Sequence, residues 1–457
     1  MKFNSYLKNL LKLSFPIVLG QIGSVLMGIT DMIMLGHIGK SEVAAAGVAN
    51  QVYFLFMVFG LGTMAVVTPL VASSKSAGKE RDCGEILRTG IELGFILSIF
   101  LTVVLILISE NFYIFQQPEE VTIIAKKYLR IIAVSNIPLF LFVALKQFSD
   151  GLSLTKPSMY ITIGAVIINI FFNWVFIYGH LTFPAMGAFG AGLATLLSRM
   201  LMALALVIYI FRNQLYKGFL PNLVSTFNTR PVIVKILKMG IPSGLQMFME
   251  IAAFTSTSIF VGWLGTEYLA AHQIVLGISA LTYTLATGLS VAGSIKIATA
   301  FGVGRKDEII IWSKYTLLTI FIIMSMFGIF LYIFKESIIY LFINENNVVL
   351  MAMPILVIAA VFQVFDGLQV AGVSMLRSVE DVNIPTAVTI ICYLCIGLPC
   401  SYIFAFNLDL GLTGIWLGML VGILLSTIFL NVRFYILLNQ KKNNTYDPIL
   451  LKTLEVI

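Results

Sequence analysis

The chain has 457 residues, of which 59% are hydrophobic and only 11% are charged, and its mean hydropathy is +0.97. Soluble domains carry about 25% charged residues, so disorder, a collagen-like fibre and a soluble enzyme are excluded. The net charge of +7 does not indicate a nucleic acid partner, because the basic residues are scattered over loops with no recognition motif beside them. The composition is that of a polytopic membrane protein in a lipid bilayer.

Taken in chain order, twelve stretches are long and apolar enough to cross a bilayer, which requires roughly 20 mostly apolar residues each. They are predicted at 14–36, 44–71, 90–109, 128–147, 159–179, 188–211, 238–263, 270–296, 315–334, 350–376, 386–406 and 412–438. The longest linker, at 212–235, separates two groups of six. The sequence therefore predicts an all-α polytopic membrane protein with twelve transmembrane helices.

The distribution of basic residues predicts the orientation. If the N-terminus is cytoplasmic, 23 of the 29 Lys and Arg residues fall in cytoplasmic segments. The remaining six are Lys40, Lys126, Lys127, Arg130 and Lys335 in outer segments and Arg199 within a span. Because cytoplasmic loops collect Lys and Arg, both termini are predicted to be cytoplasmic. The Lys-, Asn- and Ile-rich composition indicates a bacterium, and hence a multi-pass protein of its inner (plasma) membrane.

The two groups of spans share landmarks at a nearly constant spacing. Pairs 226 residues apart include Pro16 with Pro242, Gly39 with Gly265, Gly62 with Gly288 and Gly78 with Gly304; Gly187 and Gly190 pair with Gly411 and Gly414 at 224. Each copy has an even number of spans, so the copies share one orientation and are related by an axis along the membrane normal. We predict two pseudo-symmetric six-helix lobes, over 1–217 and 218–457, which suit a transporter that rocks around a central site.

Polar residues recur on single helical faces at membrane depth, at steps of three and four residues. The stripes are Gln21, Ser24, Gly28 and Asp31; Asn169 and Asn173; Ser243, Gln246, Glu250, Ala253 and Thr257; and Gln363, Asp366 and Gln369. An ionisable group near the bilayer centre costs at least about 2.5 kcal/mol, so it usually faces a bundle interior and serves function. The alternative is that these acids only make interhelical hydrogen bonds.

Carboxylates among amides and hydroxyls indicate cation chemistry. Oxygen ligands suit hard cations such as Na⁺, and burial favours the protonated carboxyl group, which makes it a proton carrier. Either property couples cation entry to substrate exit. The predicted cation or substrate site consists of Asp31, Asn169, Asn173, Gln246, Glu250, Gln363 and Asp366, with Glu250 and Asp366 as candidate Na⁺ ligands.

Motifs of enzymes and of nucleotide-driven pumps are missing from the sequence. It contains no HExxH, GxSxG or GxxxxGK[ST], so an enzyme is not expected. Without an ATP site, pumping must draw on an ion gradient, and no cofactor is expected beyond a coupling ion, Na⁺ or H⁺. The three histidines, His37, His180 and His272, fall at predicted outer ends and are expected to be interfacial, with pH sensing left open. Lys146 lies near a cytoplasmic end, where it can snorkel.

Several motifs together resemble the multidrug and toxic compound extrusion (MATE) family over nearly the whole chain. They are Pro16…Gly20-Gln21…Asp31…Gly36-His37-Ile38-Gly39, Gly187…Gly190-Ala191…Ala194-Thr195, Gly240-Ile241-Pro242…Glu250…Gly265 and Gln363…Asp366…Gln369…Leu376-Arg377…Asp381…Pro385. The resemblance implies two six-helix lobes, with Asp31, Asn169 and Asn173 as an N-lobe cation site and Glu250 and Asp366 as a C-lobe site. Asn173 stands where another prokaryotic branch carries Asp, so the chain is more similar to the NorM-like branch.

The expected function is secondary active antiport, in which organic-cation drugs or toxic metabolites leave the cell in exchange for Na⁺ or H⁺. We expect a monomer. One alternative is a lipid-linked oligosaccharide flippase of the wider superfamily, which needs a basic cavity for phosphates, and the inward acids count against it. A membrane-embedded enzyme is a third class, for which no catalytic constellation is found.

Overall fold

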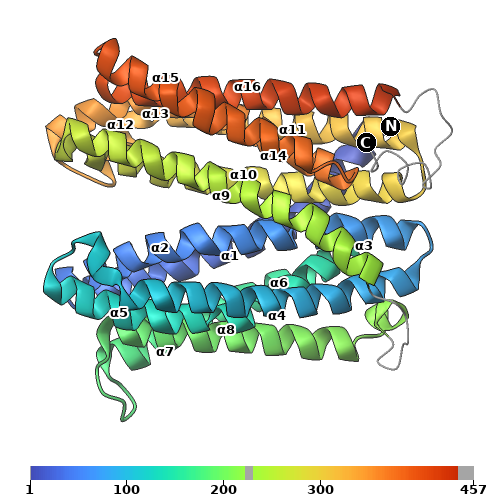
Figure 1. The fold of residues 1–457 in the computed structure, drawn as a ribbon, viewed down its shortest axis with the longest axis horizontal. Coiled ribbons are helices and arrows are strands. Elements are labelled where there is room, and N and C mark those ends of the chain that lie inside the picture. The colour runs from blue at the N-terminus through green and yellow to red at the C-terminus, as the bar shows by residue number, and fades with distance from the viewer. Residues whose placement is uncertain (1, 222–229, 441–457) are drawn as a thin grey trace. The chain divides into compact units, whose positions relative to one another are not determined.

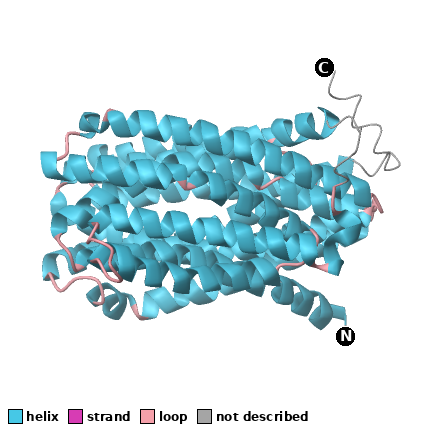
Figure 2. Cartoon of the chain, turned by 90° about the horizontal axis from the view of Figure 1, so that it is seen from below, coloured by secondary structure: helices cyan, strands magenta, loops and turns pink. Residues whose placement is uncertain are grey.

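The computed structural model describes residues 2–221 and 230–440 of the chain. Short loops join its helices, and this described part contains no strand (Figure 2). Twelve helical segments in it are long and apolar enough to cross a membrane: Ser5–Gly36, Lys40–Ser76, Glu80–Glu110, Glu119–Gly151, Lys156–Tyr178, Gly187–Arg212, Arg230–Leu264, Thr266–Gly302, Lys306–Ile333, Asn346–Ser378, Asn383–Asn407 and Gly411–Asn439. The predicted all-α fold with twelve spans is confirmed.

Most of these helices are longer than predicted. The second span, predicted at 44–71, occupies Lys40–Ser76, because polar residues that lower the hydropathy at a helix end still continue the backbone hydrogen bonds. Several spans are also interrupted. The second breaks around Ala65 and the fourth at Ser135, and hydropathy carries no signal for such breaks.

Helix packing divides the chain into two compact units. The N-terminal unit is Lys8–Thr255, and the C-terminal unit is Ser256–Ile457 with Met1–Leu7. The dividing point therefore falls within a helix, α9, and the predicted lobe boundary at residue 217 stays a prediction based on the repeat.

The N-terminal unit is built from α1 after Leu7, the helices α2 to α8, two short 3₁₀ helices and most of α9. Their bounds are α1 Lys2–Gly36, α2 Lys40–Met64, α3 Val67–Ser76, α4 Glu80–Glu110, η1 Phe112–Phe115, α5 Glu119–Val134, α6 Asn136–Gly151, α7 Lys156–Tyr178, α8 Gly187–Arg212, η2 Gln214–Phe219 and α9 Arg230–Leu264. Within this unit, α7 and α8 lie side by side along much of their length (Figure 1). From these paired helices, Asn173 of α7 and Thr195 of α8 both reach Asp31.

The C-terminal unit is built mainly from α10 to α16. The bounds are α10 Thr266–Gly302, α11 Lys306–Ile333, α12 Lys335–Tyr340, α13 Asn346–Ser378, α14 Asn383–Ile390, the π-helix η3 Ile391–Gly397, α15 Leu398–Tyr402, the π-helix η4 Ile403–Asn407 and α16 Gly411–Gln440. Helix α13 contacts α10, α11 and α16. It is therefore the central helix of this unit.

The sequence repeat reappears in the backbone of the loops. Gly78 and Gly304, 226 residues apart, end a helix with φ of 71° and 70°. Ser153 and Glu380, 227 residues apart, have φ of 63° and 66° although neither is glycine. The same helix-terminating pair of backbone hydrogen bonds closes each turn: Ser153 to Asp150 and Leu154 to Ser149 in the first half, Glu380 to Arg377 and Asp381 to Leu376 in the second. The two halves thus repeat their turn geometry as well as their glycines.

Candidate functional site

Asp31 lies at the centre of a buried hydrogen-bond network in the N-terminal unit. Asn173 of α7 donates from Nδ2 to Asp31 Oδ1 at 2.6 Å, and Thr195 of α8 donates from Oγ1 to Asp31 Oδ2 at 2.8 Å. The same Asn173 amide also donates to Asn169 Oδ1 at 3.1 Å. The consecutive helices α7 and α8 therefore meet the distant α1 at one carboxylate.

This network has polar atoms that no described residue satisfies. Asn169 and Asn173 are fully buried, yet Asn173 Oδ1 and Asn169 Nδ2 have no hydrogen-bond partner. Asp31 is 4% exposed and forms no ion pair with a described residue. Because buried polar groups are normally satisfied, a carboxylate beside an unpaired amide oxygen indicates a place for a cation.

Arg199, for which the sequence offers no role, lies one turn beyond Thr195 on α8. Its Nη1 donates to Tyr53 Oη at 2.7 Å and to Ser135 Oγ at 2.6 Å. The guanidinium carbon lies 5.4 Å from the centroid of the Tyr53 ring, and Tyr53 Oη donates to Asn136 Oδ1 at 2.8 Å. The guanidinium thus binds neutral oxygens in the interior of the unit.

On α9, Glu250 and Gln246 lie one turn apart, as predicted. Both side chains are buried, with exposed fractions of 6% and 3%, and both take part in further polar interactions. On the same helix, the centroid of the Phe248 ring lies 6.3 Å from the centroid of the Phe56 ring of α2. This part of α9 therefore packs within the N-terminal unit.

On α13, Asp366, Gln363 and Gln369 are all buried in the C-terminal unit. Gln363 Oε1 and both polar atoms of the Gln369 amide have no hydrogen-bond partner in the described part of the chain. The Asp366 carboxylate likewise has no hydrogen bond or ion pair with a described residue. Asp366 and the unpaired amide atoms of Gln363 and Gln369 on one helix form a second candidate cation-binding stripe.

The structure brings together part of the predicted site. Asp31, Asn169 and Asn173 contact one another as a group, and Thr195 joins them although the sequence analysis gave it no role. Glu250 belongs to one compact unit and Asp366 to the other, so a joint site of these two acids stays a prediction. Among the described residues, no group of three His, Cys, Asp or Glu side chains is arranged to hold a metal ion.

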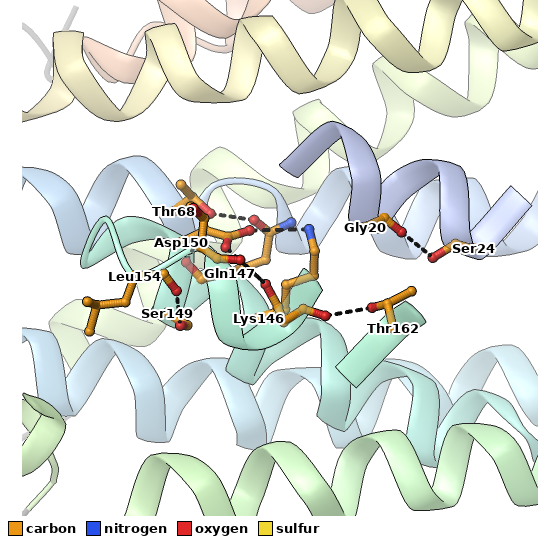
Figure 3. A network of polar contacts seen from close by, with 11 residues as sticks. Gly20, Ser24, Thr68, Lys146, Gln147, Ser149, Asp150, Leu154 and Thr162 are labelled. Carbon is orange, nitrogen blue, oxygen red and sulfur yellow. Dashed lines mark hydrogen bonds and ion pairs between the residues drawn. The ribbon is translucent and has the colours of Figure 1, made fainter. Parts of the chain in front are cut away.

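A buried ion pair lies near the end of α6, on residues that the sequence analysis did not pair. Lys146 Nζ is 3.2 Å from Asp150 Oδ2, and the Asp150 side chain is 1% exposed. Figure 3 shows this pair beside Gln147, which accepts a hydrogen bond from Thr68. The lysine predicted to snorkel to the surface therefore neutralises an internal acid.

The same end of α6 is fixed to η2 by Ser149. Its hydroxyl lies 2.7 Å from Tyr216 Oη and donates to Leu154 O at 2.6 Å. Burial raises the pKa of Tyr216 to about 12, so the phenol stays protonated at neutral pH. This turn is therefore held by neutral hydrogen bonds next to the ion pair.

The expectation that His272 is interfacial is wrong. His272 is 2% exposed and packs in the core of the C-terminal unit, where Trp416 Nε1 donates to its Nδ1 at 3.1 Å. Its Nε2 lies 3.1 Å from Ser258 Oγ. Because Nδ1 accepts a hydrogen bond, Nε2 carries the proton of the neutral ring. His272 is a core residue linking α9, α10 and α16.

Comparison with known proteins agrees with this fold. The MatE family model matches residues 16–175 and 242–403. A probable multidrug resistance protein NorM of Photorhabdus laumondii is 30% identical over 438 residues, covering 94% of this chain and 96% of the relative. The multidrug resistance protein NorM of Vibrio cholerae is 28% identical over 448 residues, covering 96% of this chain and 97% of the relative.

Solved structures share the architecture. The crystal structure of the eukaryotic MATE transporter AtDTX14 matches with a TM-score of 0.88 at 19% identity, covering 95% of this chain and 96% of that one. An outward-facing multidrug resistance MATE family transporter of the MOP superfamily matches with a TM-score of 0.87 at 21% identity, covering 96% and 97%. Together with the family model and the relatives, these matches show that the chain is a multi-pass membrane protein and belongs to the MatE family.

Proposed function

We propose that the chain is a secondary active multidrug efflux antiporter, which exports organic cations in exchange for Na⁺ or H⁺. The observation that carries this proposal is the Asp31 carboxylate, which is buried among neutral donors next to the unpaired Asn173 Oδ1. A negative charge held in an apolar interior without a contacting cation favours binding of a mobile one. The relatives named multidrug resistance proteins support drugs as the exported substrates.

Ion binding at Asp31 uses atoms that the network leaves available. Asp31 Oδ1 accepts a hydrogen bond from Asn173 and Oδ2 accepts one from Thr195, and each oxygen retains a second lone pair. Asn173 Oδ1 adds an amide oxygen, and oxygen ligands suit Na⁺. A proton instead binds one carboxylate oxygen directly. Either ion removes the net negative charge of the site.

Glu250 and Asp366 are proposed to take part in cation binding as well. Both are acids on buried helical stripes that also carry glutamine amides, Gln246 and Gln363. Binding of the coupling ion shifts the equilibrium between transporter conformations only by its differential affinity for them. An acid that binds the ion in one conformation and the organic cation in the other supplies such a difference.

The same proposal includes the location, the orientation and the oligomeric state of the protein. We place the protein in a bacterial inner membrane with both termini in the cytoplasm, on the distribution of Lys and Arg. It acts as a monomer with no resident cofactor and no nucleic acid partner, and it is a transporter rather than an enzyme. The flippase alternative is disfavoured because Asp31, Glu250 and Asp366 would repel lipid phosphates.

Efflux of a fluorescent organic cation from cells tests the proposal. Cells expressing Glu250→Gln or Asp366→Asn are expected to lose most ion-coupled efflux, since each change removes a charge and keeps the side-chain shape. Glu92→Gln, in an exposed ion pair with Arg88, serves as the matched control and should export normally. Normal ion-coupled efflux by both site variants would remove these acids from the mechanism.

A further inference from the structure

Arg199 is positioned to act on the Asp31 site through α8. Thr195, which donates to Asp31 Oδ2 at 2.8 Å, precedes Arg199 by four residues, and side chains at this spacing share one face with Cβ atoms about 5–6 Å apart. The positive charge of Arg199 is therefore fixed one helical turn from the residue that donates to the Asp31 carboxylate. The guanidinium is therefore a neighbour of the site without being one of its hydrogen-bond donors.

The contacts of Arg199 hold it in place but leave its charge uncompensated at short range. Its Nη1 donates to Tyr53 Oη at 2.7 Å and to Ser135 Oγ at 2.6 Å, and both acceptors are neutral. No described Asp or Glu forms an ion pair with it. A partly buried charge is expensive unless an opposite charge is near, and Asp31 is a buried acid held by Thr195, one turn from Arg199 on the same face of α8.

We infer that Arg199 is the fixed counter-cation of Asp31 and sets how tightly the coupling ion binds there. This inference rests on the proposed antiport. When the site is empty, the guanidinium stabilises the ionised carboxylate in the apolar interior. When Na⁺ or a proton arrives, the same positive charge repels it and speeds its release. Arg199 is thus a positioning residue that tunes ion affinity rather than a ligand.

Substitutions at this residue separate charge from packing. Arg199→Gln removes the charge and retains a hydrogen-bonding side chain, and Arg199→Lys retains the charge. A purely structural role, in which Arg199 only links α2 and α8 to Ser135, predicts that Tyr53→Phe resembles Arg199→Gln because it removes one of the links. The electrostatic role predicts that Tyr53→Phe leaves ion affinity unchanged.

The experiment measures the external ion concentration that gives half-maximal efflux of a fluorescent organic cation from proteoliposomes. Na⁺ is varied at fixed pH, and pH is varied without Na⁺. Arg199→Gln is expected to lower the half-saturating concentration of the driving ion about five- to tenfold, given how strongly charges interact at low effective dielectric, and to lower the maximal rate. Arg199→Lys, Tyr53→Phe and the exposed control Arg130→Gln should stay within about twofold of the wild type on the same reasoning.

Two further results decide the inference. In an Asp31→Asn background, Arg199→Gln should no longer shift the half-saturating concentration, because no carboxylate remains for the guanidinium to act on. The inference would be overturned by an unchanged half-saturating ion concentration in Arg199→Gln alone. It would also be overturned by an equal shift of that concentration in the Asp31→Asn background, or by a shift of it in Tyr53→Phe.

A transport-independent measurement separates this inference from the proposed function. The thermal midpoint of purified protein is recorded against Na⁺ concentration and against pH, because an ion that binds the folded state raises it. Arg199→Gln should reach half of the stabilisation at a lower ion concentration than the wild type. If no ion drives transport but this shift appears, antiport fails and the role of Arg199 stands; if neither ion stabilises the protein, the role of Arg199 fails.

Discussion

Asn173 Nδ2 donates a hydrogen bond of 2.6 Å to Asp31 Oδ1, although the two residues are 142 positions apart in sequence. The bond joins α7 to α1 and fixes the carboxylate within the N-terminal unit. Because the donor is a neutral amide, Asp31 is oriented without being neutralised. The carboxylate is thus available for a transported cation.

Asn173→Asp is expected to make transport depend more on protons. The new carboxyl group would lie at hydrogen-bond distance from Asp31, and two carboxylates that close cannot both be ionised at neutral pH. The ratio of pH-driven to Na⁺-driven efflux in proteoliposomes should rise several-fold. Asn111→Asp, at an exposed position at the end of α4, is the control, and an unchanged ratio in Asn173→Asp would argue against cation binding at Asp31.

Lys146→Met is expected to destabilise the protein by about 3–5 kcal/mol, since it leaves the buried Asp150 without its ion-pair partner. The exposed pair Arg88–Glu92 has the same i,i+4 spacing at 2.9 Å, and Arg88→Gln should change stability by roughly 0.5 kcal/mol or less. Denaturant unfolding of the purified variants compares the two pairs. Equal stability losses would show that burial of Asp150 is unimportant.

Restoring neutrality around Asp150 provides a second test of that ion pair. Lys146→Met combined with Asp150→Asn should recover part of the stability, because no isolated charge is then buried. A double variant less stable than Lys146→Met alone would contradict the electrostatic explanation.

Trp416→Phe is expected to lower stability by about 1–3 kcal/mol, because it leaves the buried His272 Nδ1 without a donor. Trp263, 62% exposed on α9 of the same unit, supplies the control, and Trp263→Phe should have little effect. The thermal midpoints of the two purified variants are compared. If both substitutions lower the midpoint equally, the His272 hydrogen bond does not stabilise the core.

Gly418→Ala is expected to disturb the contact between α16 and the segment that contains η3, α15 and η4. A Cβ atom at position 418 would clash with the backbone nitrogen of Ser401, whereas one at Gly277 meets nothing within 4 Å. Overpacking of this kind costs typically about 1–3 kcal/mol, while Gly277→Ala should be neutral or stabilising. The thermal midpoints of Gly418→Ala and Gly277→Ala are compared in detergent. Equal midpoints would mean that α16 and its neighbour can move apart without a loss of stability.

Hydropathy was sufficient to predict the twelve spans, because a bilayer-crossing helix must be long and apolar. The stripes around Asp31 and Asn173 were also visible, since residues one turn apart share a face within one helix. Contacts between helices could not be predicted from the sequence. Thr195 is an ordinary small residue in its own span, and it gains a role only because α8 packs on α1 and α7. For the same reason the partners of Arg199 and Lys146 were missed.

His272 shows where position along a span misleads. It follows a predicted outer end, which favours an interfacial site, but the span begins at Thr266 and Trp416 and Ser258 lie within hydrogen-bond reach. Hydrogen bonds to these two partners offset the cost of burying the neutral imidazole ring. A single sequence carries no signal for such a three-helix contact.

In the proposed mechanism, carboxylates inside the helical bundle couple an inward ion gradient to drug export. The most direct test is uptake of a fluorescent organic cation into proteoliposomes under an imposed Na⁺ gradient and, separately, an imposed pH gradient. We predict that at least one gradient drives uptake by the wild type and that Asp31→Asn, Glu250→Gln and Asp366→Asn combined abolish it. Uptake that is equal with and without a gradient would rule out ion-coupled antiport, and uptake that persists at full rate in the triple variant would rule out a role for these three acids.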